Sequence, residues 1–274
     1  KQALLLNTTG EENIAVGSLS LDANTTGSYN QAVGTTALTN NTTANYNIAI
    51  GRNSLYANTT GAYNVAIGSF ALDANTTANA NIGMGYAALS ACTTGTRNIA
   101  IGHESQDALT TGDQNVGLGT YALGAVTTGD LNVGLGDAAL QSTTTGYRNI
   151  GIGHDGGGQI TTGHSNISIG YDSADGLSTG SANVCIGAGT NPDNTSTYQI
   201  LLGHGVVGLG GNSFTFGKDS GNDRVYNVFT SNASWTRVSD ERYKENITPN
   251  NDCGLAFIND LNPVTFTWKA KADI

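Results

Sequence analysis

The chain has 274 residues, among them 38 glycines, and only 12% of its residues are charged. Its net charge of −10 argues against a nucleic-acid or anionic-membrane surface, since both require clustered positive charge. The sequence contains no run of about 18 apolar residues, so we expect no membrane-spanning segment and no membrane insertion. We also expect no cofactor and no metal site. Because Lys1 is not an initiator methionine, we expect the sequence to be part of a longer protein.

A five-residue motif, Asn-apolar-small-apolar-Gly, recurs every 17 residues without insertion or deletion. A Thr-Thr-Gly turn or a close equivalent begins five residues before each Asn. Stacked coils penalise changes of length that loops would tolerate, so this constant frame indicates a solenoid. The first residues of the motifs are Asn13, Asn30, Asn47, Asn64, Asn81, Asn98, Asn115, Asn132, Asn149, Asn166 and Asn183.

The sequence therefore predicts an all-β fold, a β-solenoid or β-roll of 17-residue coils over residues 1–203. We expect one chain to close each coil by itself, with neighbouring coils about 4.8 Å apart. Stacked Asn side chains are expected to hydrogen-bond from coil to coil as a ladder.

Within each frame the residues after Asn alternate as in a short β-strand. Residues 48–51 read Ile-Ala-Ile-Gly, and residues 65–68 read Val-Ala-Ile-Gly. We expect the branched residues, such as Ile101, to point into the coil and the small residue to face a crowded neighbouring surface. The invariant Gly predicts a positive φ or a close backbone approach that a Cβ would obstruct.

A second inward position is expected eight residues after Asn. It holds a leucine in most frames, and each buried leucine is worth roughly 1.5–3 kcal/mol. The leucine is replaced by Gln106, Gly157, Ala174 and Asn191, so we expect the later coils to be narrower or looser. The leucines are Leu21, Leu38, Leu55, Leu72, Leu89, Leu123 and Leu140.

The two residues before each Asn vary freely, which indicates an exposed edge. Tyr29, Tyr46 and Tyr63 would stack there as an aromatic stripe. Such a stripe could contact a glycan or another receptor, or it could simply fill a stacked surface edge.

The cysteines and histidines do not form a recognisable site. Cys92, Cys185 and Cys253 lie far apart in different phases of the repeat, so we interpret them as buried or incidental thiols without an intrachain disulfide. His103 and His154 occupy the same frame position three coils apart, too distant to share a metal, and are interpreted as surface residues.

The repeat resembles the β-roll heads of trimeric autotransporter adhesins and the Asn-x-Ala-Ile-Gly repeats of phage tail-fibre proteins. The resemblance covers roughly residues 7–203 and implies a homotrimeric rod. A strand buried on both faces independently requires a partner surface.

After Gly187 the frame decays, and residues 204–238 are predicted to form a neck. Charged residues become frequent from Ser239, so we expect a new domain over residues 239–274. Residues 239–247 read Ser-Asp-Glu-Arg-Tyr-Lys-Glu-Asn-Ile, and residues 262–269 read Asn-Pro-Val-Thr-Phe-Thr-Trp-Lys. These motifs resemble the start of the S74 intramolecular chaperone domain of endosialidase tailspikes and phage fibres.

The S74 resemblance implies a small α+β domain that trimerises, assists folding of the preceding β-structure and then cuts itself off. Carried over to this sequence, Ser239 is the nucleophile, Lys244 is the base, and the Val238–Ser239 bond is cleaved. The chemistry is reasonable because a desolvated lysine loses its proton more readily and can activate a hydroxyl. We therefore expect at most an autocatalytic serine endopeptidase and no metabolic activity.

Together, the two resemblances imply a structural trimeric fibre located on a virion, which attaches to a cell-surface receptor such as a glycan. The alternative is a bacterial cell-surface adhesin, which a secretion signal in the full gene would distinguish. A glycan-degrading tailspike is disfavoured, because scattered acids such as Asp73, Asp107 and Asp137 do not form a convincing acid pair.

Overall fold

The fold was analysed in a computed structural model, which describes residues 2–219, 223–230 and 236–237. The chain divides into two units, residues 1–238 and residues 239–274, and all described residues lie in the first. The described residues form strands, turns and loops, and they contain no helix that could cross a membrane. The predicted all-β solenoid is confirmed.

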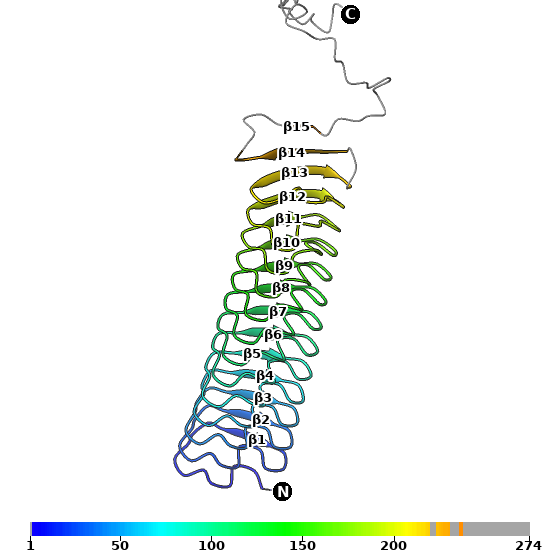
Figure 1. Ribbon diagram of the computed structural model, residues 1–274. Helices are drawn as coiled ribbons and strands as arrows, with labels where there is room; N and C mark the ends of the chain where they lie inside the picture. Colours follow the sequence, from blue (N-terminus) through cyan, green and yellow to red (C-terminus); the bar gives the residue numbers. More distant parts are fainter. Residues whose placement is uncertain (1, 220–222, 231–235, 238–274) are drawn as a thin grey trace, which may run out of the picture. The chain divides into compact units, whose positions relative to one another are not determined.

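Eleven three-residue strands stack in sequence order, one for each repeat frame (Figure 1). Each of the first ten strands pairs in parallel with the strand 17 residues further on, as in Ile48↔Val65 and Ile50↔Ile67. Consecutive frames of one chain are therefore direct neighbours, as expected for a self-closed coil. The strands are β1 (Ile14–Val16), β2 (Gln31–Val33), β3 (Ile48–Ile50), β4 (Val65–Ile67), β5 (Ile82–Met84), β6 (Ile99–Ile101), β7 (Val116–Leu118), β8 (Val133–Leu135), β9 (Ile150–Ile152), β10 (Ile167–Ile169) and β11 (Val184–Ile186).

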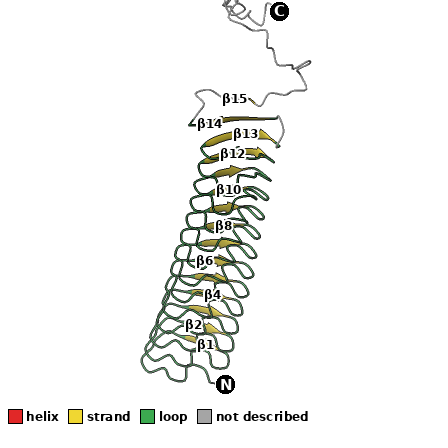
Figure 2. Cartoon of the chain, in the orientation of Figure 1, coloured by secondary structure: helices red, strands yellow, loops and turns green. Residues whose placement is uncertain are grey.

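The sheet changes character beyond β11. The parallel partners β12 (Gln199–His204) and β13 (Ser213–Lys218) continue the stack with shorter connections, pairing Val184↔Ile200 and Ile200↔Phe214. Then β14 (Arg224–Val228) and β15 (Thr236–Arg237) pair antiparallel, so the coil geometry ends here. Figure 2 shows the short strands on one wall of the stack and loops on the remaining walls.

The orientation of the strand is the reverse of our expectation. The small middle residue, such as Ala100, is fully buried inside the coil, whereas Ile101 points outward and is 40% exposed. Period-two alternation separates the two faces but does not say which one is internal. The interior is already filled by leucines and asparagines from the other walls, so only a small side chain fits opposite them.

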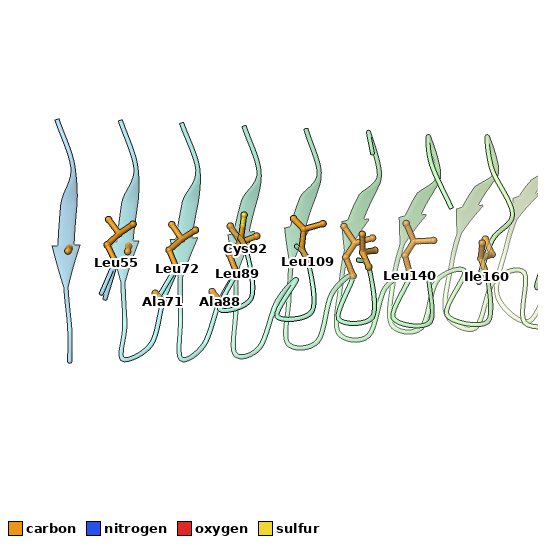
Figure 3. Close-up of a cluster of buried hydrophobic side chains, with 14 of the residues drawn as sticks. Leu55, Ala71, Leu72, Ala88, Leu89, Cys92, Leu109, Leu140 and Ile160 are labelled. Carbon is orange, nitrogen blue, oxygen red and sulfur yellow. The ribbon is translucent and has the colours of Figure 1, made fainter. Parts of the chain in front are cut away.

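A column of fully buried leucines forms the centre of the core (Figure 3). The prediction for this position is confirmed. Where leucine is missing, as at Gln106, Gly157 and Ala174, the residue three positions later is bulky and buried. These residues are Leu109, Ile160 and Leu177. The core thus stays filled in these three coils, which we expected to be narrower or looser. At Asn191 the replacement does not occur, because Asn191 and Asn194 are both exposed.

Asparagine side chains join each coil to the next. The Oδ1 of Asn98 accepts the backbone N–H of Asn115 at 2.9 Å, and its Nδ2 donates to the Gly112 carbonyl at 2.8 Å. A second ladder, which the motif did not reveal, runs through Asn24, Asn41 and Asn58 to Asn75 by direct amide contacts of 2.8–2.9 Å. It stops where Cys92 takes the next place, leaving the buried Asn75 Oδ1 without a partner.

Gln106 introduces a polar group into the leucine column, and we expect its replacement by leucine to stabilise the solenoid. Its Nε2 donates to the Ile99 carbonyl at 2.7 Å, but its buried Oε1 has no partner. Removing an unsatisfied buried oxygen should raise the free energy of unfolding by about 1–3 kcal/mol. Gly117 leaves the space that leucine needs, as Gly83 does for Leu72.

Chemical denaturation of Gln106→Leu and wild type measures this effect. Gln114→Leu is the control, because residue 114 lies on the exposed edge where another frame carries Leu131. A loss of stability in Gln106→Leu would show that the amide is required by the fold.

Candidate functional site

The outward side of β1–β11 is an apolar surface, which we call the outer sheet face. It consists of the first and third residues of each strand, and Gln31 is its only polar member. All of these side chains are exposed or half-buried in the single chain. Ile14 and Val16 at one end are 50% and 58% exposed. A continuous apolar strip of this length is unusual for a surface in contact with water.

The outer sheet face leads into a groove near the end of the parallel stack. The groove has a volume of about 440 Å³ and is lined by Ala182, Val184, Tyr198, Ile200, Asn212 and Phe229. Val184 and Ile200 belong to the same outward column, so the groove extends this face and is not a separate cavity.

The predicted aromatic stripe is present at the edge that precedes each strand. The rings of Tyr29 and Tyr46 lie 4.9 Å apart at 4°, and those of Tyr46 and Tyr63 lie 5.1 Å apart at 8°. We call these three residues the tyrosine ladder. Glu12 precedes Tyr29 in the same column, and the negative charge of Glu12 is the main reason that the pKa of Tyr29 is raised.

A second aromatic column lies on the turn that follows each strand, and our sequence reasoning missed it. Phe70, Tyr86, His103 and Tyr121 contact one another in sequence with centroid distances of 5.3–5.9 Å. Each of these residues lies five or six positions after the Asn that begins the repeat motif of its coil. Comparing that position across frames would have revealed the column.

The histidines of this edge are exposed, as expected. His154 stacks on Tyr171 at 5.3 Å, and its Nε2 lies 3.5 Å from an Asp137 carboxylate oxygen. The nearest acid to His103 is Glu104, at 3.9 Å. Within the described parts of the chain, no three His, Cys, Asp or Glu side chains cluster as metal ligands would.

The thiols of Cys92 and Cys185 are buried in the coil, which confirms one part of the cysteine prediction. Burial raises the pKa of each to about 12, so neither is a reactive thiolate at neutral pH. Cys253 lies outside the described residues.

The predicted catalytic pair also lies outside the described residues. The structure therefore gives no geometry for Ser239, Lys244 or the Val238–Ser239 bond. Their roles stay predictions that come from the sequence motif.

The described part of the chain is thus a β-solenoid with an apolar outer face and two aromatic edges. Residues 239–273 match the family described as Peptidase_S74, chaperone of endosialidase. No curated protein and no solved structure gives a significant match to this chain. A β-solenoid followed by an S74 segment fits a protein of the tail-fibre or tailspike type.

Proposed function

We propose that this protein is a structural fibre, a phage tail fibre or part of a related device, which assembles as a homotrimer and attaches to a cell surface. The observation that carries the proposal is the outer sheet face together with the S74 segment. S74 domains are associated with trimeric fibres, which supports self-association. The location on a virion and the cell-surface receptor are part of the same proposal.

The outer sheet face is suited to a second and third copy of this chain. It carries no charged side chain over eleven coils, so packing it against an identical face desolvates no ion. At about 4.8 Å per coil, eleven coils extend roughly 50 Å. Because every copy has the same spacing, parallel copies can pack coil against coil around a threefold axis.

Ile101→Asp tests the assembly. Residue 101 is half-exposed in the single chain, so we expect the coil to fold, whereas a charge buried between copies should prevent the trimer from forming. Light scattering after size-exclusion chromatography of the full-length protein should show a trimer for wild type and a smaller species for Ile101→Asp. Circular dichroism should report the same strand content for both.

Ile101→Val is the matched control and should remain trimeric. A wild-type protein that is monomeric at micromolar concentration, or an Ile101→Asp variant that stays trimeric, would contradict packing through this face.

For the C-terminal domain, we expect self-cleavage between Val238 and Ser239 in the complete protein. The Ser/Lys pair becomes active only after assembly desolvates Lys244 and lowers its pKa, so that the neutral amine can take the Ser239 proton. Ser239→Ala and Lys244→Ala should each give a longer chain on a denaturing gel, and Ser234→Ala should not. Equal lengths in wild type and both mutants would limit the domain to a chaperone role.

A further inference from the structure

The tyrosine ladder ends at Tyr63 in the fourth coil. In the fifth coil the same position of the column holds Ala80 and no ring, and we call this gap the empty rung. Ala80 occupies the place after Tyr63, with φ values of 59° and 61° respectively, so the backbone continues unchanged and only the ring is missing. Both residues are exposed, and Tyr63 is the most exposed ring of the ladder at 62%. One ring face of Tyr63 is therefore uncovered above Ala80.

Arg97 is the next residue of the column after Ala80, so it lies on the side of the empty rung away from Tyr63. Arg97 is exposed, and within the described residues its guanidinium has no ion pair, side-chain hydrogen bond or aromatic contact. Arg52 and Arg148, by contrast, lie over the rings of Phe70 and Tyr147 at 5.6 Å. Arg97 is thus a free cation on a chain whose net charge is −10.

One polar residue, Asn79, borders the same place, and an acid, Asp113, lies in the coil beyond Arg97. The Asn79 Oδ1 accepts the Ala62 backbone N–H at 2.7 Å, which fixes the amide and leaves its Nδ2 free to donate. The Asp113 carboxylate of a neighbouring coil is held by Thr96, whose N–H and hydroxyl donate to it at 2.6 and 2.9 Å. Among the described residues, that carboxylate forms no ion pair with Arg97.

We propose that the empty rung between Tyr63 and Arg97 binds a uronate-type sugar, a six-membered ring that carries a carboxylate. Two coil steps separate Tyr63 from Arg97, about 10 Å, and the ladder spacing of 4.9–5.1 Å shows that one ring fits per step. The apolar C–H face of the sugar packs on the electron-rich face of Tyr63. Its carboxylate pairs with Arg97, and a hydroxyl accepts a hydrogen bond from Asn79 Nδ2.

This inference deepens the proposed attachment function by naming a receptor class, and it rests on that function for its biological role. All the residues of the slot come from one chain. A failure of trimerisation would therefore not remove the site, and the two proposals can fail separately.

Binding of short oligogalacturonate and oligoglucuronate to the full-length protein tests the slot by isothermal titration calorimetry. The neutral galactose and glucose oligomers, in which hydroxymethyl replaces each carboxylate, should bind at least about tenfold more weakly. Arg97→Gln should weaken uronate binding by a similar factor. Ala80→Tyr should abolish it, because the new ring completes the ladder and fills the slot.

Arg148→Gln is the matched control, since Arg148 occupies the same column and is equally an exposed arginine, and it should bind as wild type does. The melting temperature of Ala80→Tyr should not fall, because Tyr63 adopts the same backbone conformation. The proposal is overturned if neither uronate binds, or if Arg97→Gln and Ala80→Tyr bind uronate as well as wild type does.

Discussion

Gly102→Ala is expected to break the solenoid into two separately unfolding stacks. Gly102 has a φ of 141°, and an added Cβ would lie 2.3 Å from the Gly119 carbonyl oxygen of the next coil. That oxygen belongs to the backbone, so no side chain can move aside. We expect a loss of more than about 4 kcal/mol, because the substitution combines backbone strain with separation of two coils.

The consequence should be visible in the shape of the unfolding curve. In a linear repeat protein each coil is stabilised by its two neighbours, so a broken contact uncouples the coils on either side. Thermal unfolding followed by circular dichroism should change from one transition to two. Gly124→Ala is the control, because its φ is not in the positive range, its added Cβ meets nothing closer than 3.2 Å, and other frames carry Asp73 or Tyr56 at this position.

A single cooperative transition in Gly102→Ala, at the wild-type temperature, would contradict this account of the invariant glycine. The close backbone approach would then not limit the stacking of coils.

Asn98→Ala is expected to destabilise the protein by at least about 2–6 kcal/mol. The substitution leaves two buried backbone groups unpaired, the Asn115 N–H and the Gly112 carbonyl, each of which costs about 1–3 kcal/mol. The buried cavity left by the amide adds to this cost. Urea denaturation of the variant and of wild type gives the difference in the free energy of unfolding.

Asn40→Ala is the matched control, because the Asn40 side chain is half-buried on a turn and makes no side-chain hydrogen bond among the described residues. It should change stability by less than about 0.5 kcal/mol. Equal effects of the two substitutions would mean that the buried amides do not hold the coils together.

The sequence was sufficient to predict the architecture, because the stacking of identical coils fixes both the length of a frame and the residues at each contact. The frame of 17 residues, the leucine column and the invariant glycine could all be predicted for this reason. Gly102 shows both features expected of that glycine, a positive φ and a close backbone approach. The S74 motif was equally readable, since residues 239–273 match that family.

The tertiary structure decided which side of each strand is internal. Alternation places Ala100 and Ile101 on opposite faces of the strand. Which face is internal depends on how much space the leucines and asparagines of the other walls leave in the coil. The replacement of a missing leucine by Leu109, Ile160 or Leu177 is a packing effect of the same kind. The empty rung between Tyr63 and Arg97 also became visible only when consecutive frames were stacked, because it arises from residues 17 positions apart that share one column.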